Sequence, residues 1–395
     1  MRLGTDMKTL LKNCALRSGV RTDILVEDGL IAGIGSFATA DQVYDMTGYA
    51  AVLPGFIDAH MHLITGNVPY EDTFLRAWAQ AGVTTLRDLG VGDDMRTHPT
   101  EKFIAFRDKA AEDPECAQCL TSGRFVAADG GYGNAMMDTL TGYGCKTPQD
   151  CTDAVNELLD IGCDGIKTAV DRGGPMFGGE KPLLTTELLT AMREAAEQRG
   201  VWCCAHVLES DLVERLLDAG FTQLAHMPID RISDETLERM VRQHISVVPT
   251  ICAVDAPRPP LPEGVELPPL PEGIEMPDTK AQERQCVDNV ARFVKLGGKV
   301  AVGTDAMRME IQPEVAGMPL RELRLLHEAG LSVDEVIDAA TINAAEVCGI
   351  ADQVGSIAVG KRANLIAVKD PIDEGFDALA HVEFVMNRGI VIKNI

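Results

Sequence analysis

The stretch that decides the fold reads Gly55-Phe56-Ile57-Asp58-Ala59-His60-Met61-His62, an apolar segment that closes on two histidines. Residues two apart on a strand point to the same side, so His60 and His62 would face one side together. Burying two imidazoles is costly unless something binds them, and imidazole is a good ligand for zinc and its neighbours. We therefore expect metal ligands at the end of this strand, although the pair taken alone would also fit an exposed position.

Outward from this stretch, strand-like apolar runs alternate with helical patterns. The expected strands are Val52–His62, Val83–Leu89, Leu120–Ala127, Gly165–Val170, Val201–His206, Thr222–His226, Ile245–Ile251 and Val300–Asp305. Intervening segments such as Thr186–Arg199 carry apolar residues at helical spacing, and several end in glycine. Eight such units predict an α/β fold, the (β/α)8 or TIM barrel. An open doubly wound sheet is the alternative, but no GxGxxG motif follows an early strand.

Both ends of the chain show short strands separated by turns. Neither end has enough strands for a stable sheet of its own. We expect residues 1–50 and 351–395 to form one small β-sandwich domain, and residues 51–350 to form the barrel. The segment Pro257 to Pro277 is rich in proline and should be a long loop on the face where barrel loops build the active site. A substrate lid and a solvated surface loop fit it equally well.

The composition excludes several classes of partner. The 395 residues carry a formal net charge of −24, which argues against nucleic acid and against anionic membranes. No uninterrupted apolar run is long enough to span a bilayer, and the first residues do not resemble a secretory signal. Eleven scattered cysteines fit a reducing cytoplasm, and the lone CxxC at Cys116 and Cys119 is a weak metal signal. We expect a cytoplasmic homo-oligomer that acts on a small molecule.

Other ionisable residues also close expected strands. His206 ends the fifth strand, His226 the sixth and Asp305 the eighth. The carboxyl ends of barrel strands form the catalytic face, so these side chains should converge with His60 and His62. Each alone could be a hydrogen-bonded rim residue, but five on one rim are hard to explain without a metal.

Lys167 is the decisive residue, because it lies within the apolar fourth strand. A buried ammonium is expensive to desolvate, so such a lysine usually marks chemistry or pairing. Beside two cations the neutral amine is favoured, and carbon dioxide can add to it to form a carbamate. That anionic group can bridge two metals.

This combination resembles the amidohydrolase superfamily, in its binuclear subtype with a carboxylated lysine. The flanking segments agree, and resemble the imidazolonepropionase-like branch that includes Xaa-Pro dipeptidases; they are Asp23–Gly29, Leu53–Asp58, Ala81–Asp88 and Gly355–Lys361. The resemblance runs over nearly the whole chain. It implies two divalent metal ions, with zinc the expected metal.

The resemblance also implies a role for each ligand. His60, His62 and Asp305 would hold the first metal, His206 and His226 the second, and carboxylated Lys167 would bridge them with a hydroxide. Asp305 would act as general acid/base, taking the proton of the hydroxide and passing it to the leaving amine. Arg87 and Asp88, at the end of the second strand, would form a structural pair.

Two loops depart from the pattern of the family. A Gly-Gly-His-Gly loop is expected after the third strand, where this chain has Gly130-Gly131-Tyr132-Gly133. The loop after Lys167 is one residue longer and includes Arg172. Tyr132 and Arg172 are therefore candidate substrate contacts, Arg172 for a carboxylate. Both could instead be rim residues that make local bonds.

We therefore expect hydrolysis of a C–N amide bond in a small substrate such as a dipeptide or an N-acyl amino acid. One alternative is a cyclic amide or lactone hydrolase with the same binuclear site. Another is a catalytically silent binding protein on the same fold, which would need a missing ligand or base. A mononuclear aminohydrolase is disfavoured because Lys167 would serve no purpose there.

Overall fold

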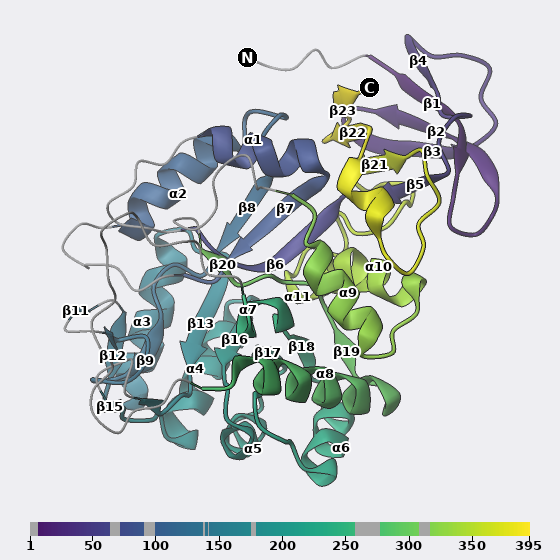
Figure 1. The fold of residues 1–395 in the computed structure, drawn as a ribbon. Helices are drawn as coiled ribbons and strands as arrows, with labels where there is room; N and C mark the ends of the chain where they lie inside the picture. The colour runs from purple at the N-terminus through teal and green to yellow at the C-terminus, as the bar shows by residue number, and fades with distance from the viewer. Residues whose placement is uncertain are drawn as a thin grey trace, which may run out of the picture.

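The protein is known from a computed structural model that describes residues 7–63, 72–90, 99–136, 139–140, 142–174, 179–256, 277–307 and 317–395. Its centre consists of parallel strands in two sheets (Figure 1). One sheet has the order β20-β6-β7-β8, with β6 at Phe56–His62, β7 at Val83–Asp88, β8 at Gln118–Thr121 and β20 at Ala306–Met307. The other has the order β12-β9-β13-β16-β17-β18-β19, with β9 at Val126–Ala128, β12 at Tyr143–Cys145, β13 at Gly165–Ala169, β16 at Trp202–His206, β17 at Gln223–Ala225, β18 at Ser246–Val248 and β19 at Lys299–Val300.

Backbone hydrogen bonds join the two sheets at both of their junctions. At one junction, the Ala59 amide donates to the Val302 carbonyl at 2.9 Å and the Asp305 amide to the His60 carbonyl at 2.7 Å. At the other, the Asp164 amide donates to the Thr121 carbonyl at 2.8 Å. Every residue of β13 and β16 is buried, as is typical of parallel strands covered on both faces.

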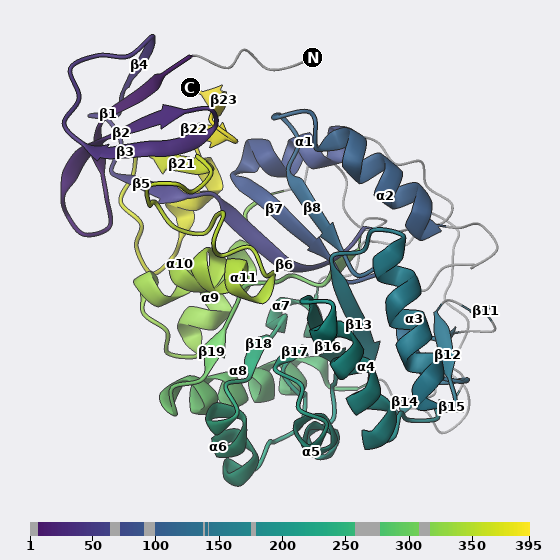
Figure 2. The same ribbon diagram turned by 180° about the vertical axis from the view of Figure 1, so that it is seen from behind.

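Helices lie outside the strands, as Figures 1 and 2 show. They are α1 (Asp72–Ala81), α2 (Pro99–Ala110), α3 (Pro148–Asp160), α4 (Thr186–Gln198), α5 (Ser210–Asp218), α6 (Asp234–Arg242), α7 (Ile251–Val254), α8 (Thr279–Lys295), α9 (Leu320–Glu328), α10 (Val333–Ala340) and α11 (Ile342–Val347). Local sequence explains where several begin. Thr147 and Asp150 form a capping box before α3, and Ser332 and Glu335 form one before α10.

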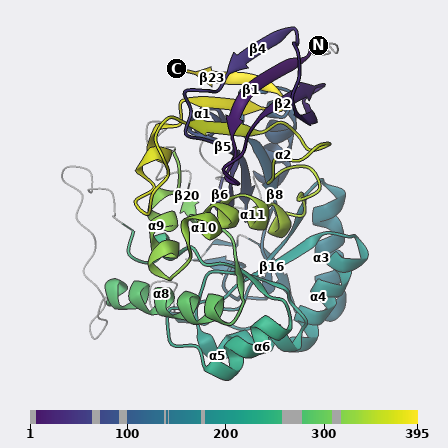
Figure 3. The ribbon, with the colours of Figure 1, turned by 90° about the vertical axis from the view of Figure 1, so that its right-hand side faces the viewer.

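A second unit joins strands from the two ends of the chain (Figure 3). One of its sheets has the order β3-β2-β1-β4, with β1 at Thr9–Ala15, β2 at Arg21–Glu27, β3 at Leu30–Gly35 and β4 at Gln42–Asp45. The other has the order β23-β22-β21-β5, with β5 at Ala51–Pro54, β21 at Leu365–Val368, β22 at Phe384–Asn387 and β23 at Ile390–Asn394. A single apolar cluster draws on both sheets, with Leu11, Ile24 and Val26 packed with Leu365 and Phe384.

Short elements complete the described structure. Two small antiparallel pairs are β10 (Ala135–Met136) with β11 (Thr139–Leu140) and β14 (Gly173–Gly174) with β15 (Gly179–Glu180). A 3-10 helix, η5, spans Asp377–His381. In the described parts of the chain, no helix is long and apolar enough to cross a membrane.

Two expected strands are wrong in extent. The expected strand Val52–His62 is two strands, because Pro54 ends β5 in the small unit and Gly55 lets β6 begin beside Thr84. A Cβ on Gly55 would lie 2.4 Å from Thr84 Oγ1, so only glycine permits this approach. The expected strand Leu120–Ala127 is likewise split into β8 and β9. The proline-rich loop lies outside the described residues up to its last residue, Pro277.

Arg87 on β7 is fully buried among backbone carbonyls. Its Nε donates to the Ala59 carbonyl at 2.7 Å and its Nη1 to the Val347 carbonyl at 2.8 Å. The guanidinium carbon lies 4.7 Å from the centre of the Trp202 ring. Arg87 therefore joins β6, α11 and β16 from within. The expected pairing with Asp88 gives way to these bonds, since successive side chains on a strand face opposite ways.

We expect Arg87→Met to lower the free energy of unfolding by about 3 kcal/mol or more, because several buried acceptors lose their donor at once. The matched control is Arg242→Met, since Arg242 is exposed and forms a surface ion pair with Glu238 at 3.4 Å. Such a surface ion pair contributes about 0–1 kcal/mol. Urea unfolding of both variants checks this, and equal losses would contradict the structural role given to Arg87.

Candidate metal centre

His60, His62 and Asp305 come together where β6 ends. Nε2 of His62 lies 2.8 Å from Oδ1 of Asp305, and Nε2 of His60 lies 3.2 Å from the same oxygen. One ligand atom from each residue falls within 4.8 Å of the others. His60 and His62 stand two positions apart on β6, and the turn after β19 places Asp305 beside them. The three residues predicted for the first metal therefore lie together.

Asp58 and Gly303 hold this corner in place. Asp58 is buried and accepts the Thr304 hydroxyl at 2.7 Å and the Thr304 amide at 3.1 Å. Burial raises the pKa of Asp58 to about 6, even though these donors act to lower it. A Cβ on Gly303 would lie 2.7 Å from the Cβ of His60, so a glycine is required for the turn to pass that close. Neither residue had been assigned a role from the sequence, although Asp58 shares the period-two face of His60 and His62.

His206 and His226 continue the cluster from the neighbouring strands. The ring centroid of His226 lies 4.7 Å from that of His60 and 4.5 Å from that of His206. Together with His62, whose centroid lies 5.2 Å from that of His60, these four imidazoles form a continuous row. The convergence predicted for strand ends five and six is therefore present in the structure.

The row of imidazoles affects the protonation of its members. Burial, followed by the charge of Lys167, lowers the pKa of His60 well below its usual value. Burial, followed by the charge of His206, does the same to His226. Burial acts to raise the pKa of Asp305, but the charges of His60 and His226 outweigh it and hold that pKa well below the usual range. At His62 burial acts to lower the pKa, but the hydrogen bond and the charge of Asp305 outweigh it and raise that pKa. Neutral imidazoles at His60 and His226 beside the Asp305 carboxylate are the states that bind a metal.

Lys167 projects from β13 into this cluster and is fully buried. Its Nζ has no hydrogen-bond partner among the described residues and lies 5.9 Å from the centroid of the Phe125 ring. Burial lowers the pKa of Lys167 to about 8. About a tenth of the amine is therefore uncharged at pH 7, far more than for an ordinary lysine, and addition of carbon dioxide requires this uncharged form.

The donor set fits divalent metal ions. Buried polar atoms are almost always hydrogen-bonded, yet Lys167 Nζ and both ring nitrogens of His60 form no hydrogen bond among the described residues. Imidazole nitrogens with one carboxylate suit zinc and related metals. A bound metal ion would give the His60 imidazole, and a carbamate on Lys167, the partner that each otherwise lacks among the described residues.

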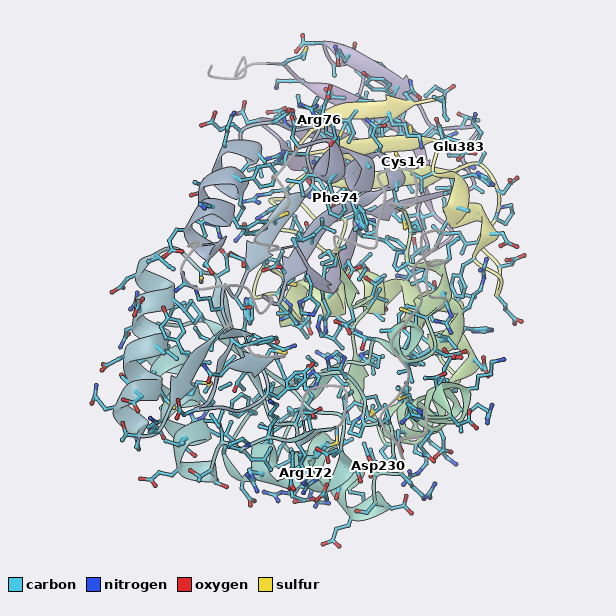
Figure 4. All side chains as sticks on the ribbon, turned by 60° about the vertical axis from the view of Figure 1, so that its left-hand side comes forward. Cys14, Phe74, Arg76, Arg172, Asp230 and Glu383 are labelled. Carbon is cyan, nitrogen blue, oxygen red and sulfur yellow. The ribbon has the colours of Figure 1, made fainter. Side chains whose placement is uncertain are left out.

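The two candidate substrate contacts lie in different surroundings. Tyr132 is half-buried, and its ring stacks on that of His206 with centroids 4.7 Å apart and planes 18° apart. Burial, followed by the charge of Asp171, raises the pKa of the Tyr132 phenol. Arg172 lies at the lower edge of the molecule (Figure 4), where Nη1 contacts Glu209 at 2.7 Å and Nη2 contacts Asp211 at 2.6 Å. Tyr132 therefore lies at the cluster, whereas the Arg172 guanidinium is bound by two carboxylates.

Three further residues hold the histidines or the backbone beside them through hydrogen-bond contacts. Each of these residues lies far in sequence from its partner. Asp171 contacts Nε2 of His206 at 2.9 Å, and Thr250 contacts Nδ1 of His226 at 2.7 Å. Glu322, fully buried on α9, accepts the amide of Cys252 at 2.8 Å and that of Ile251 at 3.2 Å, just after Thr250. Burial raises the pKa of Glu322 to about 7. In the sequence, Asp171 and Thr250 are polar residues two positions after the ends of β13 and β18. This placement was the signal from which their contact with the ligand histidines could have been inferred.

Parallel strands that end in histidine and aspartate around a buried lysine define an α/β class of metal-binding domain. The model of the amidohydrolase family matches residues 51–395. The chain belongs to the amidohydrolase family, as its sequence predicted.

Comparisons with individual proteins agree with this assignment. An imidazolonepropionase of Syntrophobacter fumaroxidans is 26% identical over 388 residues, which cover 88% of this chain and 83% of that protein. An uncharacterized protein of Mycobacterium tuberculosis is 25% identical over 221 residues, 54% of this chain, so that the match spans about half (53%) of that relative's length. A solved Xaa-Pro dipeptidase with methionine bound in its active site has a TM-score of 0.77 at 24% identity, covering 98% of this chain and 100% of that one. These likenesses support the predicted imidazolonepropionase-like branch and a barrel with an added domain.

Proposed function

We propose that the chain is a binuclear metal-dependent hydrolase that cleaves the C–N bond of a small amide. The observation that carries this proposal is the buried amine of Lys167, which lies within a cluster of histidines and has no hydrogen-bond partner in the described segments. A mononuclear site would leave that amine without a function, whereas a carbamate formed on it would supply an anion that reaches two metals. The likeness to an imidazolonepropionase over 88% of the chain also supports C–N chemistry.

The ligands divide into two sets in this proposal. His60, His62 and Asp305 hold one divalent ion, for which zinc is our choice, and their ligand atoms within 4.8 Å support this set. His206 and His226 would hold the second ion, and a carbamate on Lys167 would supply an anionic ligand to both ions. The hydrogen bonds across both sheet junctions support a closed (β/α)8 barrel as the scaffold. We place the boundary with the small β-sandwich domain after Pro54, because β5 pairs with β21.

Asp305 moves the proton in the proposed reaction. When bound, the two metal ions polarise the scissile carbonyl and lower the pKa of the attacking water. Asp305 is partly exposed, with 27% of its side chain accessible, and lies against His60 and His62. Its carboxylate can therefore take the proton of the water and deliver it to the leaving amine, as a general base and then a general acid.

Tyr132 is the substrate contact that we propose. Its ring packs on His206, so its phenol lies within the cluster. Arg172 would first have to leave Glu209 and Asp211 to reach a substrate carboxylate. A dipeptide or an N-acyl amino acid is the substrate class that we favour, and Tyr132 is the residue whose phenol would hydrogen-bond it.

The proposal is tested with metal-free protein reloaded with Zn²⁺ and assayed on dipeptides, N-acyl amino acids, cyclic amides and lactones. We expect about two equivalents of zinc per chain and turnover of linear amides, with Asp305→Asn as the control for contaminating hydrolases. Turnover confined to cyclic amides or lactones would favour the ring-opening alternative. A protein that binds two equivalents but turns over nothing in the panel would favour the silent binding protein.

We further propose that the protein works in the cytoplasm as a homo-oligomer on a small-molecule substrate, with no nucleic-acid or membrane partner. All eleven cysteines are free thiols, and all but Cys252 are buried, which supports a reducing compartment. Sedimentation of the purified protein measures the oligomeric state directly.

A further inference from the structure

Arg172, just after the buried strand β13, is held through its side chain, its amide and its carbonyl. Its Nη1 lies 2.7 Å from Oε1 of Glu209, and Nη1 and Nη2 lie 3.0 Å and 2.6 Å from the two carboxylate oxygens of Asp211. Its amide donates to Oε2 of Glu209 at 3.1 Å, and its carbonyl accepts the Lys181 amide at 2.8 Å. The contact with Asp211 is bidentate, the geometry for which a guanidinium is best suited. Both the side chain and the backbone of Arg172 are therefore fixed.

The contact with Lys181 closes the pair of short strands β14 and β15 on Arg172. These strands pair in antiparallel register, so the chain returns beside Arg172 at Lys181. Pro182 comes next in the sequence. The two carboxylates that hold Arg172 therefore also fix where Pro182 lies.

Pro182 packs against residues 129–134, the Tyr132 loop. A Cβ on Gly131 would lie 2.7 Å from the Pro182 carbonyl oxygen, so a side chain at this position would collide with the backbone. The φ of Gly131 is outside the left-handed region, so the close contact, and not the backbone conformation, requires glycine there. The backbones on the two sides of this contact therefore cannot move independently.

The Tyr132 loop transmits this contact to the Tyr132 ring. The Asn134 amide donates to the Gly131 carbonyl at 3.0 Å, which closes a tight turn around Tyr132. The ring of Tyr132 stacks on that of His206 with centroids 4.7 Å apart. A shift of Pro182 would therefore move Tyr132 relative to the ligand histidines.

We propose that Arg172 is a positioning residue, which holds Pro182 against the Tyr132 loop and so sets the Tyr132 phenol for the substrate. This inference rests on the proposed function for the task of the phenol, but the packing is a property of the metal-free chain. It gives Arg172 a different role from direct binding of a substrate carboxylate. For direct binding, the guanidinium would have to leave both carboxylates that already hold it.

The first experiment measures hydrogen exchange in metal-free protein, so it needs neither zinc nor substrate. In Arg172→Met we expect the amides of the Tyr132 loop to exchange about two- to fivefold faster, the range for loss of partly exposed ion pairs. Arg239→Met is the matched control, because Arg239 also binds two carboxylates, those of Glu214 and Asp218, where it joins α6 to α5. Unchanged exchange of the Tyr132 loop in Arg172→Met overturns the proposal.

Gly131→Ala tests the same contact from the other side. The added Cβ must displace Pro182 or the loop, so the same amides should exchange faster although Arg172 and its carboxylates are intact. Gly48→Ala is the control, because a Cβ on Gly48 would meet nothing within 4 Å. If Gly131→Ala leaves exchange in the loop as it is in the unaltered chain, the contact does not set the loop and the proposal fails.

The second experiment measures KM and kcat on whichever dipeptide or N-acyl amino acid the zinc-loaded enzyme turns over fastest. We expect Arg172→Met to raise KM about 3- to 10-fold with kcat little changed, since a displaced phenol loses about one hydrogen bond to the substrate. In a Tyr132→Phe enzyme the same substitution should have no further effect on KM, because the phenol through which it acts is gone. An equal rise of KM in both backgrounds would mean that Arg172 binds the substrate itself, and would overturn the proposal.

The two experiments distinguish the failure of this inference from the failure of the proposed function. A chain that turns over no amide refutes the function, yet the exchange rates still decide whether Arg172 holds the Tyr132 loop. Thermal unfolding of each variant separates a local effect from a general one. A lowered Tm together with faster exchange throughout the chain would mean that Arg172 has only a structural role, and would overturn the positioning role.

Discussion

Replacing Lys167 by alanine should leave a folded protein that binds less than two equivalents of zinc and turns over its substrate at least about 1,000-fold more slowly. The bridging carbamate would be lost, and metal ions contribute several kcal/mol to charge stabilisation, where each 1.36 kcal/mol is a factor of ten in rate. Folding should survive, because Nζ of Lys167 makes no hydrogen bond with the described residues and its removal frees no buried partner. Metal analysis and steady-state kinetics on the same preparation check both expectations.

The space left by the Lys167 side chain allows a chemical rescue experiment. Lys167→Ala leaves space for a small carboxylic acid, so acetate or propionate should restore part of the zinc binding and of the activity. Lys295→Ala, on the exposed part of α8, should change neither quantity. If Lys167→Ala retains both zinc equivalents, the bridge is contradicted and a different role for this lysine follows.

Asp305→Asn should lower kcat by about 100- to 10,000-fold, which is the range for a positioned general acid/base. The amide keeps the size of the carboxylate but cannot take a proton from water. Because His60 and His62 remain, we expect zinc to stay bound, although more weakly at the first position. Measurement of kcat on zinc-saturated variant protein separates the two effects.

The matched control for Asp305→Asn is Asp230→Asn. Asp230 accepts the amide and hydroxyl of Ser210 at 2.8 Å and 2.6 Å and contacts none of the predicted ligands. It lies near Arg172 in Figure 4. The role of Asp305 as the proton carrier is contradicted if zinc-saturated Asp305→Asn keeps more than a tenth of the kcat of the unaltered enzyme.

The ligand cluster could be predicted from the sequence because parallel strands impose simple rules. Alternation along β6 puts His60 and His62 on one face, and strand ends meet at one edge, so His206, His226 and Asp305 follow from their places. Lys167 was recognised by a different rule, the cost of burying an ammonium in an apolar strand.

The supporting residues could not be predicted, because their bonds join segments far apart in the chain. The contact of Glu322 with Cys252 spans 70 positions, and that of Asp171 with His206 spans 35. The orientation of a loop side chain such as Arg172 depends on which carboxylates face it, and Glu209 and Asp211 lie on a different loop and helix. The break between β5 and β6 was missed although Pro54-Gly55 marks it, because apolar residues stand on both sides of this dipeptide.

The small unit has a consequence for synthesis of the chain. Its apolar cluster needs Leu365 and Phe384 as well as Leu11 and Ile24, so the sheet made first has no partner until the last strands exist. During translation at about 5–20 residues per second, that sheet must wait while the whole α/β region is made. We therefore expect β21 to β23 to dock on this sheet only after the α/β region has been synthesised. A nascent chain stalled before Leu365 would expose the apolar face of β1 and β2. We expect a chaperone that recognises apolar segments to bind such a chain.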